Sequence, residues 1–358
     1  MALDISKIKN SKEFSQFLEF SKEIGKDISM VQAAGGNTSM KLGDTMWVKA
    51  SGKWLINACA EEIMVPVNIS KVKTILKNEE FSEKELSVSK ISDDKIALRP
   101  SVETPLHAVL DFKYVLHTHD VNVISIAIQN NSQALFKNVM SEFNWKFLPY
   151  IKPGIELSKQ LLAIKSKSDN VFVLQNHGLI VCGDSLDEIK QLNLKIRESL
   201  ENEVIKKVKL NYKNDIRLEI NLQNTEYKFL NEDYAFTLAN NKTWLKKISF
   251  GSFLPDLLVF LGPKVLTIEP DPENLSMILN KLSELSLPLN ACVILAGVGV
   301  IVRKDSLKGT AELIRLLYEL MLRVPDEANL EYFNNNQISE LLNWEAEHYR
   351  QHLNKINQ

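Results

Sequence analysis

The chain has 358 residues, of which 45% are hydrophobic and 25% are charged, and its formal net charge is −2 at pH 7. The length favours two domains with a sizeable core, and the small charge gives no support to a nucleic-acid or membrane-surface partner. Three scattered cysteines, no signal-peptide pattern and no apolar run near the roughly 20 residues that span a bilayer indicate a cytoplasmic protein.

The first half of the chain has a pattern of alternating helices and strands, which is typical of an α/β fold. Thr104 as an N-cap and Pro105 at the first helical position predict a helix start. The other expected elements are a helix over 12–25, a small-residue loop over 31–39, strands over 46–49, 114–119 and 147–151, a helix over 156–166, two strands over 171–182, and a helix from about 184 to 209.

The second half begins with a polar, asparagine-rich segment over 211–246, which we interpret as the domain junction. We therefore predict a catalytic domain over residues 1–245 and a smaller α/β domain, of unknown role, over 246–358. The elements expected in the smaller domain are strands over 257–261, 265–268 and 291–302, and helices over 272–285, 306–323 and 337–354.

Part of the second domain resembles part of the first. Residues 294–307 (ILAGVGVIVRKDSL) align without gaps on residues 173–186 (VLQNHGLIVCGDSL). Either the two segments are copies of one unit, or two similar strand–turn–strand units arose independently. In both cases Val298 stands where the first segment has His177, so we expect no metal site in the second domain.

Three of the six histidines fall in two short segments. His117 and His119 are two residues apart in an apolar stretch that reads as a strand, so their side chains lie on one face. His177 follows a second apolar run and precedes a glycine. Three neutral imidazoles with one open position are the ligand set of a catalytic zinc ion. The competing interpretation is that they are hydrogen-bonded core histidines.

Five segments share an order with one known family. GGNTSMK, WVKASG, RPSVETPLH, LHTHD and LQNHGLIVCGDSLDE resemble the class II aldolase/adducin superfamily over about residues 10–210. FLPYIKPG and NWEAEHYRQHL look like the aldolase part of rhamnulose-phosphate aldolase/short-chain dehydrogenase fusion proteins. The resemblance implies a three-layer α/β/α domain followed by a smaller C-terminal α/β domain.

The resemblance also implies roles for particular residues. His117, His119 and His177 would bind Zn²⁺ or another divalent ion, and Glu103 would be the catalytic acid/base. The phosphate of the substrate would lie on Gly36, Asn37, Ser51, Gly52 and Ser101. In several such aldolases a tyrosine from the neighbouring subunit protonates the leaving group, and Tyr150, Tyr212 and Tyr227 are candidates for that role.

The activity implied is that of an aldehyde-lyase in carbohydrate metabolism, such as rhamnose catabolism. It would cleave a ketose 1-phosphate, similar to rhamnulose or fuculose 1-phosphate, into dihydroxyacetone phosphate and an aldehyde through a metal-bound enediolate. The family's site lies between subunits, which implies a homo-oligomer, most often a tetramer.

Two residues bear on which reaction is implied. Glu103 stands where the related 4-epimerases have Asp, which favours cleavage. Val102 stands where phosphate-binding members often have a second serine, so an unphosphorylated or differently held substrate is an alternative interpretation. The alternatives are an epimerase, a decarboxylase or a dehydratase on the same metal site, or a non-catalytic adducin-like binding module.

Overall fold

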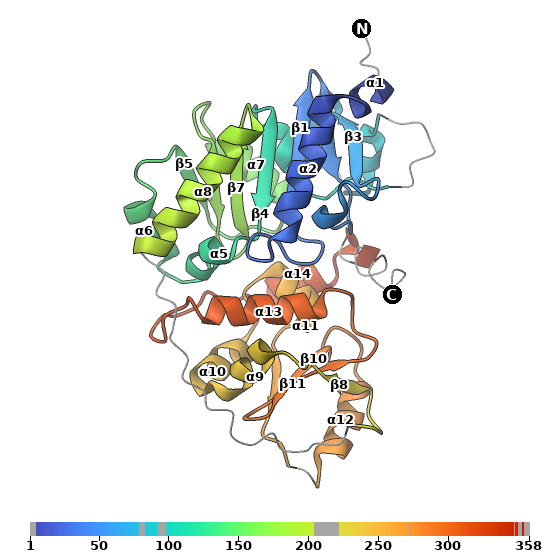
Figure 1. Ribbon diagram of the computed structural model, residues 1–358, viewed down its shortest axis with the longest axis vertical. Coiled ribbons are helices and arrows are strands. Elements are labelled where there is room, and N and C mark those ends of the chain that lie inside the picture. The colour runs from blue at the N-terminus through green and yellow to red at the C-terminus, as the bar shows by residue number, and fades with distance from the viewer. Residues whose placement is uncertain are drawn as a thin grey trace. The chain divides into compact units, whose positions relative to one another are not determined.

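The computed structural model describes residues 5–78, 83–91, 98–203, 222–271, 273–346, 348, 349 and 353. The chain divides into two compact units, and each contains its own sheet (Figure 1). The first unit comprises Met1–Ala127 and Ser132–Val204, and the second comprises Ile128–Asn131 and Ile205–Gln358. No helix in the described part of the chain is both long enough and apolar enough to cross a bilayer.

The first unit is built on a seven-stranded sheet with the strand order β3-β2-β1-β4-β7-β6-β5. Strands β5 and β6 are parallel, and the other described pairs are antiparallel. The strands are β1 (Asn37–Leu42), β2 (Thr45–Lys49), β3 (Met64–Asn68), β4 (Tyr114–Thr118), β5 (Trp145–Leu148), β6 (Val171–Leu174) and β7 (Gly178–Gly183).

Helices cover both faces of this sheet. Helices α2 and α8 lie over one face (Figure 1), while α3, α4 and α7 bury apolar side chains against the other. The helices of this unit are α1 (Ile5–Lys9), α2 (Lys12–Lys26), α3 (Ile69–Lys77), α4 (Thr104–Val109), α5 (Val121–Ala127), α6 (Ser132–Val139), α7 (Ile155–Ile164) and α8 (Leu186–Glu203), with 3-10 turns at Leu55–Asn57 and Glu83–Ser89. The predicted three-layer α/β/α class is confirmed.

Strand β4 runs through the middle of the sheet and is buried along its whole length. Val115 belongs to the core formed with α3, α4 and α7. Because strand side chains alternate between the two faces, His117 lies on the same face as Val115. The fold therefore directs a buried histidine toward the helix layer that contains α4.

The second unit contains a four-stranded sheet in the order β8-β11-β10-β9, with β9 and β10 parallel. Its core includes buried residues of β8, β10 and α12. The strands are β8 (Tyr227–Phe229), β9 (Leu266–Ile268), β10 (Cys292–Leu295) and β11 (Gly299–Arg303). The helices are α9 (Asp233–Asn240), α10 (Lys242–Phe250), α11 (Pro255–Leu261), α12 (Leu275–Ser283), α13 (Thr310–Met321) and α14 (Asn335–Leu342). The predicted smaller α/β region is thus present.

Several predicted elements differ from the observed ones. Residues 257–261 form part of helix α11 and not a strand, and the strand predicted over 291–302 is the β10–β11 hairpin. The compact units divide after Val204, earlier than the domain boundary predicted at residues 245 and 246. The reason is that β8 pairs with β11, so the segment expected to be a junction contains a strand of the second sheet. Residues 204–221, including the end of the predicted long helix and Tyr212, lie outside the described residues.

Candidate metal centre

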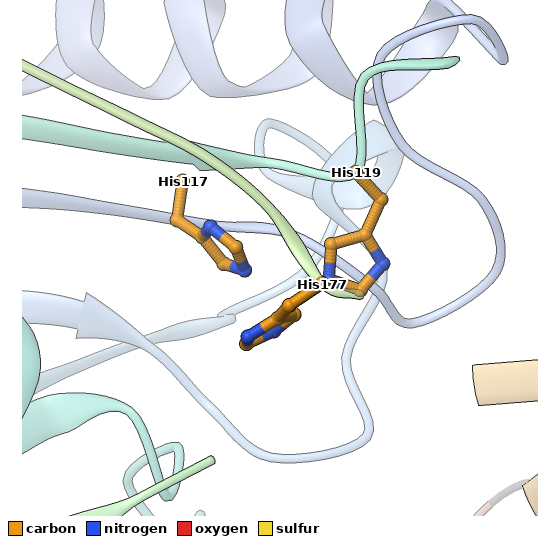
Figure 2. Close-up of side chains that lie close together, drawn as sticks. All are labelled: His117, His119 and His177. Atoms are coloured by element: carbon orange, nitrogen blue, oxygen red, sulfur yellow. The ribbon is translucent and has the colours of Figure 1, made fainter. Parts of the chain in front are cut away.

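The three predicted ligand histidines lie together in the first unit. His117 is in β4, His119 follows that strand directly, and His177 is in the turn between β6 and β7. Their ring centroids are 4.7 Å (His117–His177), 5.1 Å (His117–His119) and 5.4 Å (His119–His177) apart. All three are buried, and one ligand atom from each lies within 4.8 Å of the others (Figure 2). The imidazoles are therefore close enough to bind one ion.

Strand pairing and one glycine bring His177 against β4. Asn176 adopts a positive φ of 53°, and His177 N–H donates to the Leu174 carbonyl at 3.2 Å, which closes the turn. A Cβ on Gly178 would lie 2.2 Å from the Thr118 carbonyl oxygen. Because only glycine permits this approach, the sequence Asn-His-Gly places the histidine beside the end of β4.

Glu103 completes the cluster from the helix layer. It occupies the N-cap position of α4, one residue before the predicted cap Thr104, but its side chain makes no capping hydrogen bond. Its Oε1 lies 3.3 Å from Nε2 of His117 and 3.3 Å from Nε2 of His177. The Ser101 hydroxyl accepts a hydrogen bond from the Glu103 backbone N–H at 3.2 Å. The carboxylate is thus directed into the histidine cluster.

The tautomer of His117 indicates that a proton or a cation belongs between its Nε2 and the Glu103 carboxylate. Its Nδ1 is 3.0 Å from the Leu179 carbonyl oxygen, which can only accept, so Nδ1 carries the hydrogen. In the neutral ring, the Nε2 lone pair then faces the Glu103 oxygen, and Nε2 has no hydrogen-bond partner among the described residues. A lone pair and a carboxylate oxygen at this distance repel unless a proton or a cation lies between them.

The electrostatics favour the cation. Burial lowers the pKa of His117 to about 3, so this imidazole resists a proton at neutral pH. Burial alone would raise the pKa of the Glu103 carboxyl, but the neighbouring His117, His177 and His119 outweigh it and hold that pKa below its usual range. Neutral imidazoles beside an ionised carboxylate are the form in which these groups bind a divalent metal.

His107 supports the site without joining the cluster. It lies one helical turn after Glu103, its backbone N–H donates to the Glu103 carbonyl at 3.2 Å, and its side chain is buried. Its Nδ1 is 2.8 Å from the Ser39 hydroxyl of β1, and burial lowers its pKa to about 3. His107 therefore fastens the start of α4 to the sheet.

The five predicted phosphate-binding residues lie in three segments that meet at Lys49, a residue not predicted from the sequence. The Lys49 N–H donates to Asn37 Oδ1 at 3.3 Å, and the Lys49 carbonyl accepts from Ser101 N–H at 3.2 Å. Lys49 Nζ donates to the carbonyls of Ala34 and Lys53, at 2.6 and 2.8 Å. Lys49 is the last residue of β2, and every residue of that strand is buried.

The same contacts place the predicted residues relative to the histidines. Asn37 is the register partner of His117 on the neighbouring strand. Gly36 and Gly52 have positive φ values of 63° and 74°, and Ser51 N–H donates to the Arg99 carbonyl at 2.9 Å. Two glycine turns and the Ser101 segment thus adjoin one buried ammonium group. Of the candidate tyrosines, Tyr227 lies in β8 of the second unit, and its hydroxyl donates to the Asn290 carbonyl.

Comparison with known proteins decides the family. Residues 16–204, more than half of the chain, match the model of the class II aldolase and adducin N-terminal domain. The chain belongs to the class II aldolase and adducin family. That match ends where the first compact unit ends, and class II aldolases typically depend on a divalent metal.

The relatives that match this chain cover about half of it. It is 29% identical over 192 residues to the uncharacterized oxidoreductase YuxG of Bacillus subtilis strain 168, a match of 50% of this chain and 27% of YuxG. The chain therefore spans about a quarter of that relative.

Solved structures cover a similar share of the chain. The N-terminal class II aldolase domain of a Thermoplasma acidophilum protein is 28% identical, with a TM-score of 0.47, over 54% of this chain and 93% of that one. The L-fuculose-1-phosphate aldolase of Thermus thermophilus is 14% identical, with a TM-score of 0.35, over 52% and 93%.

Proposed function

We propose that this chain is a zinc-dependent aldehyde-lyase. It would cleave a ketose 1-phosphate of the rhamnulose or fuculose 1-phosphate type into dihydroxyacetone phosphate and an aldehyde. The observation that carries the proposal is the Glu103 carboxylate, 3.3 Å from Nε2 of both His117 and His177. A proton-transfer group and a metal-ligand set at one buried point are what aldol cleavage requires.

The histidines would hold the ion, and the fit rests on the unpaired Nε2 of His117 facing a carboxylate oxygen. When bound, a divalent ion stabilises as a Lewis acid the negative charge that develops on the ketose oxygens. The hydrogen bond from His117 Nδ1 to the Leu179 carbonyl fixes the ring orientation, as groups outside the ligand set do in other metal sites.

Glu103 would move the proton. In the cleavage direction the bond between C3 and C4 breaks, the C4 hydroxyl loses its proton to the ionised Glu103 carboxylate as C4 becomes the aldehyde carbon, and the bonding electrons stay with the ketone fragment. That fragment becomes dihydroxyacetone phosphate when C3 receives a proton, and we assign its delivery to Glu103. The Ser101 hydroxyl and the start of α4 hold the Glu103 backbone in place.

The turns around Lys49 would bind the phosphate. Gly36 and Asn37, Ser51 and Gly52, and Ser101 offer backbone N–H groups, hydroxyls and an amide, which hold phosphate without a cluster of basic residues. The buried ammonium of Lys49 adds positive charge beneath them. Val102 follows Ser101 and offers no hydroxyl. This residue favours a second candidate, a decarboxylase, dehydratase or epimerase that uses the same metal centre on a differently held substrate.

The test is turnover by Glu103→Gln, which keeps the size of the side chain and removes its acid–base function. We expect dihydroxyacetone phosphate release to fall by about 10² to 10⁴-fold while zinc content is unchanged. Glu142→Gln is the matched control, because Glu142 is exposed in a turn of the same unit. Full turnover by Glu103→Gln would refute the mechanism.

We also propose that the protein acts in the cytoplasm as a homo-oligomer, with a tetramer as the expected assembly. Light scattering coupled to size-exclusion chromatography measures the subunit count directly. A monomer with full activity would contradict a site completed between subunits.

A further inference from the structure

The sheet of the second unit repeats four strands of the first. The order β8-β11-β10-β9 corresponds to β4-β7-β6-β5, the part of the large sheet that carries the histidines. The directions correspond as well. In each set the first two pairs are antiparallel and the last pair is parallel.

The register and the turns also correspond. Leu174 pairs with Gly178 at the end of the first hairpin, and Leu295 pairs with Gly299 at the end of the second. In both turns the middle residue has a positive φ, 53° at Asn176 and 75° at Gly297. The alignment of residues 294–307 on 173–186 therefore reflects one three-dimensional arrangement.

The backbone contacts of each turn extend the correspondence to the neighbouring helix. Asn176 N–H donates to the carbonyl of Ala127 at the end of α5, and Gly297 N–H donates to the carbonyl of Ala239 in α9. Helix α5 follows β4 as α9 follows β8, and α7 precedes β6 as α12 precedes β10. The second unit thus copies the half of the first unit that holds the metal ligands.

Different side chains occupy the ligand positions of the copy. His117 pairs with Ile180, and Phe229 pairs with the corresponding Ile301. Asn231 follows two residues later, as His119 does, and Val298 takes the place of His177 in the turn. None of these three side chains is an imidazole, so the copy keeps the position of the centre without its metal chemistry.

A cavity of about 100 Å³ lies at that position. Its lining includes all three substituted residues and is completed by Leu230, Glu232, Phe236 and Gly299. A water molecule needs roughly 10–15 Å³ of such volume, so the cavity accommodates about seven to ten non-hydrogen atoms. It is lined by two phenyl rings, one carboxylate and one amide, with no lysine or arginine.

We propose that this cavity is a second, non-catalytic site that binds a small unphosphorylated sugar or polyol. The phenyl rings fit the C–H face of such a ligand, while Glu232 and Asn231 would accept hydrogen bonds from its hydroxyls. The strands that carry the phosphate-site turns, β1–β3, have no described counterpart beside β8, which is an edge strand in the described sheet. The choice of a sugar as the ligand rests on the function proposed for the first unit. The presence of the cavity does not depend on that function.

The experiment uses the full chain carrying His177→Ala, so that binding at the metal centre does not contribute. Erythrulose and xylitol, a sugar and a polyol within that size, are titrated calorimetrically against this protein and against the same protein with Glu232→Gln or Phe236→Ala added. We expect saturable binding that weakens by about five-fold or more with either addition. Glu226→Gln, an exposed position of the same unit, should leave it unchanged.

Three results would overturn the proposal. These are no saturable binding in the His177→Ala protein, equal binding after both Glu232→Gln and Phe236→Ala, or preferential binding of ethanolamine or choline. Cleavage of ketose 1-phosphates by the protein with native residues 103 and 177 is measured in parallel. If cleavage fails while sugar binding persists, only the proposed function falls. If cleavage persists without sugar binding, only this inference falls.

Discussion

The β6–β7 hairpin and the β10–β11 hairpin share one backbone arrangement and differ in chemistry. The register, the positive φ of the middle turn residue and the hydrogen bond from that residue to α5 or α9 are common to both. His177 stands in one turn and Val298 in the other, and both are buried. Strand pairing and turn contacts therefore set the position of the centre, while a few side chains decide whether it can hold a metal.

The hairpins also differ in how closely their glycines approach the neighbouring strand. A Cβ on Gly178 would lie 2.2 Å from the Thr118 carbonyl oxygen, whereas one on Gly299 would lie 3.8 Å from the Phe229 ring. The tighter approach belongs to the hairpin that presents a ligand. Close packing at this point serves the centre and is not needed for the hairpin itself.

The largest expected effect comes from changing the turn residues. His177→Ala removes one of three ligands, so zinc affinity should fall by more than about 100-fold and turnover should fall to background. Val298→Ala, the same position in the copy, should change neither. Zinc content by mass spectrometry and turnover are measured on both proteins, and equal losses in the two would contradict the assignment.

Replacing Gly178 or Gly299 with alanine tests how closely the backbone packs at each hairpin. Gly178→Ala forces a carbonyl oxygen to move and should cost about 3 kcal/mol of unfolding free energy. Gly299→Ala should cost only about 1 kcal/mol, because its φ of 159° disfavours a side chain while its surroundings leave room for a methyl group. Urea unfolding of the two variants measures the difference. An equal cost would show that the close approach at Thr118 can relax.

Restoring histidines in the second unit would sharpen the correspondence. The triple variant Phe229→His, Asn231→His and Val298→His should bind one additional zinc ion per chain, because three imidazoles would then stand at the equivalent positions. Isothermal titration with zinc gives the stoichiometry. If the variant has native circular dichroism but unchanged stoichiometry, the alignment of the two sites is wrong.

The effect that is smallest at neutral pH comes from His107. Because burial lowers the pKa of His107 to about 3, the unfolded chain binds a proton below about pH 6.5 that the folded chain does not. Stability should therefore fall as pH drops from about 6.5 toward 3, by up to about 1.4 kcal/mol per pH unit for this group. His107→Gln should reduce that slope in metal-free protein, as urea unfolding at several pH values would show.

The sequence predicted the alternation of helices and strands in the first unit because its apolar periods are clear. In α2, for example, Phe14, Phe17 and Ile24 fall on one buried face. It did not predict α11, where every residue from Pro255 to Leu261 is buried, so no polar face reveals a helical period. Pro255 at the start of that run was the available signal.

The candidate site was predictable in part for the same reason. Two histidines two residues apart in a strand pattern indicate a metal site in the sequence. In the structure, His177 and Glu103 lie beside them. The role of Lys49 was not predictable, because its contacts join segments that are remote in sequence. The cavity at Phe229 could not be predicted either, since it depends on a copied arrangement whose side chains have changed.

The most direct test of the central claim is dihydroxyacetone phosphate release from rhamnulose and fuculose 1-phosphate by zinc-loaded protein, with and without chelator. The account predicts release that disappears when zinc is removed and returns when zinc is restored. No release from either substrate by protein shown to contain zinc would contradict the aldolase assignment and favour another reaction at the same three histidines.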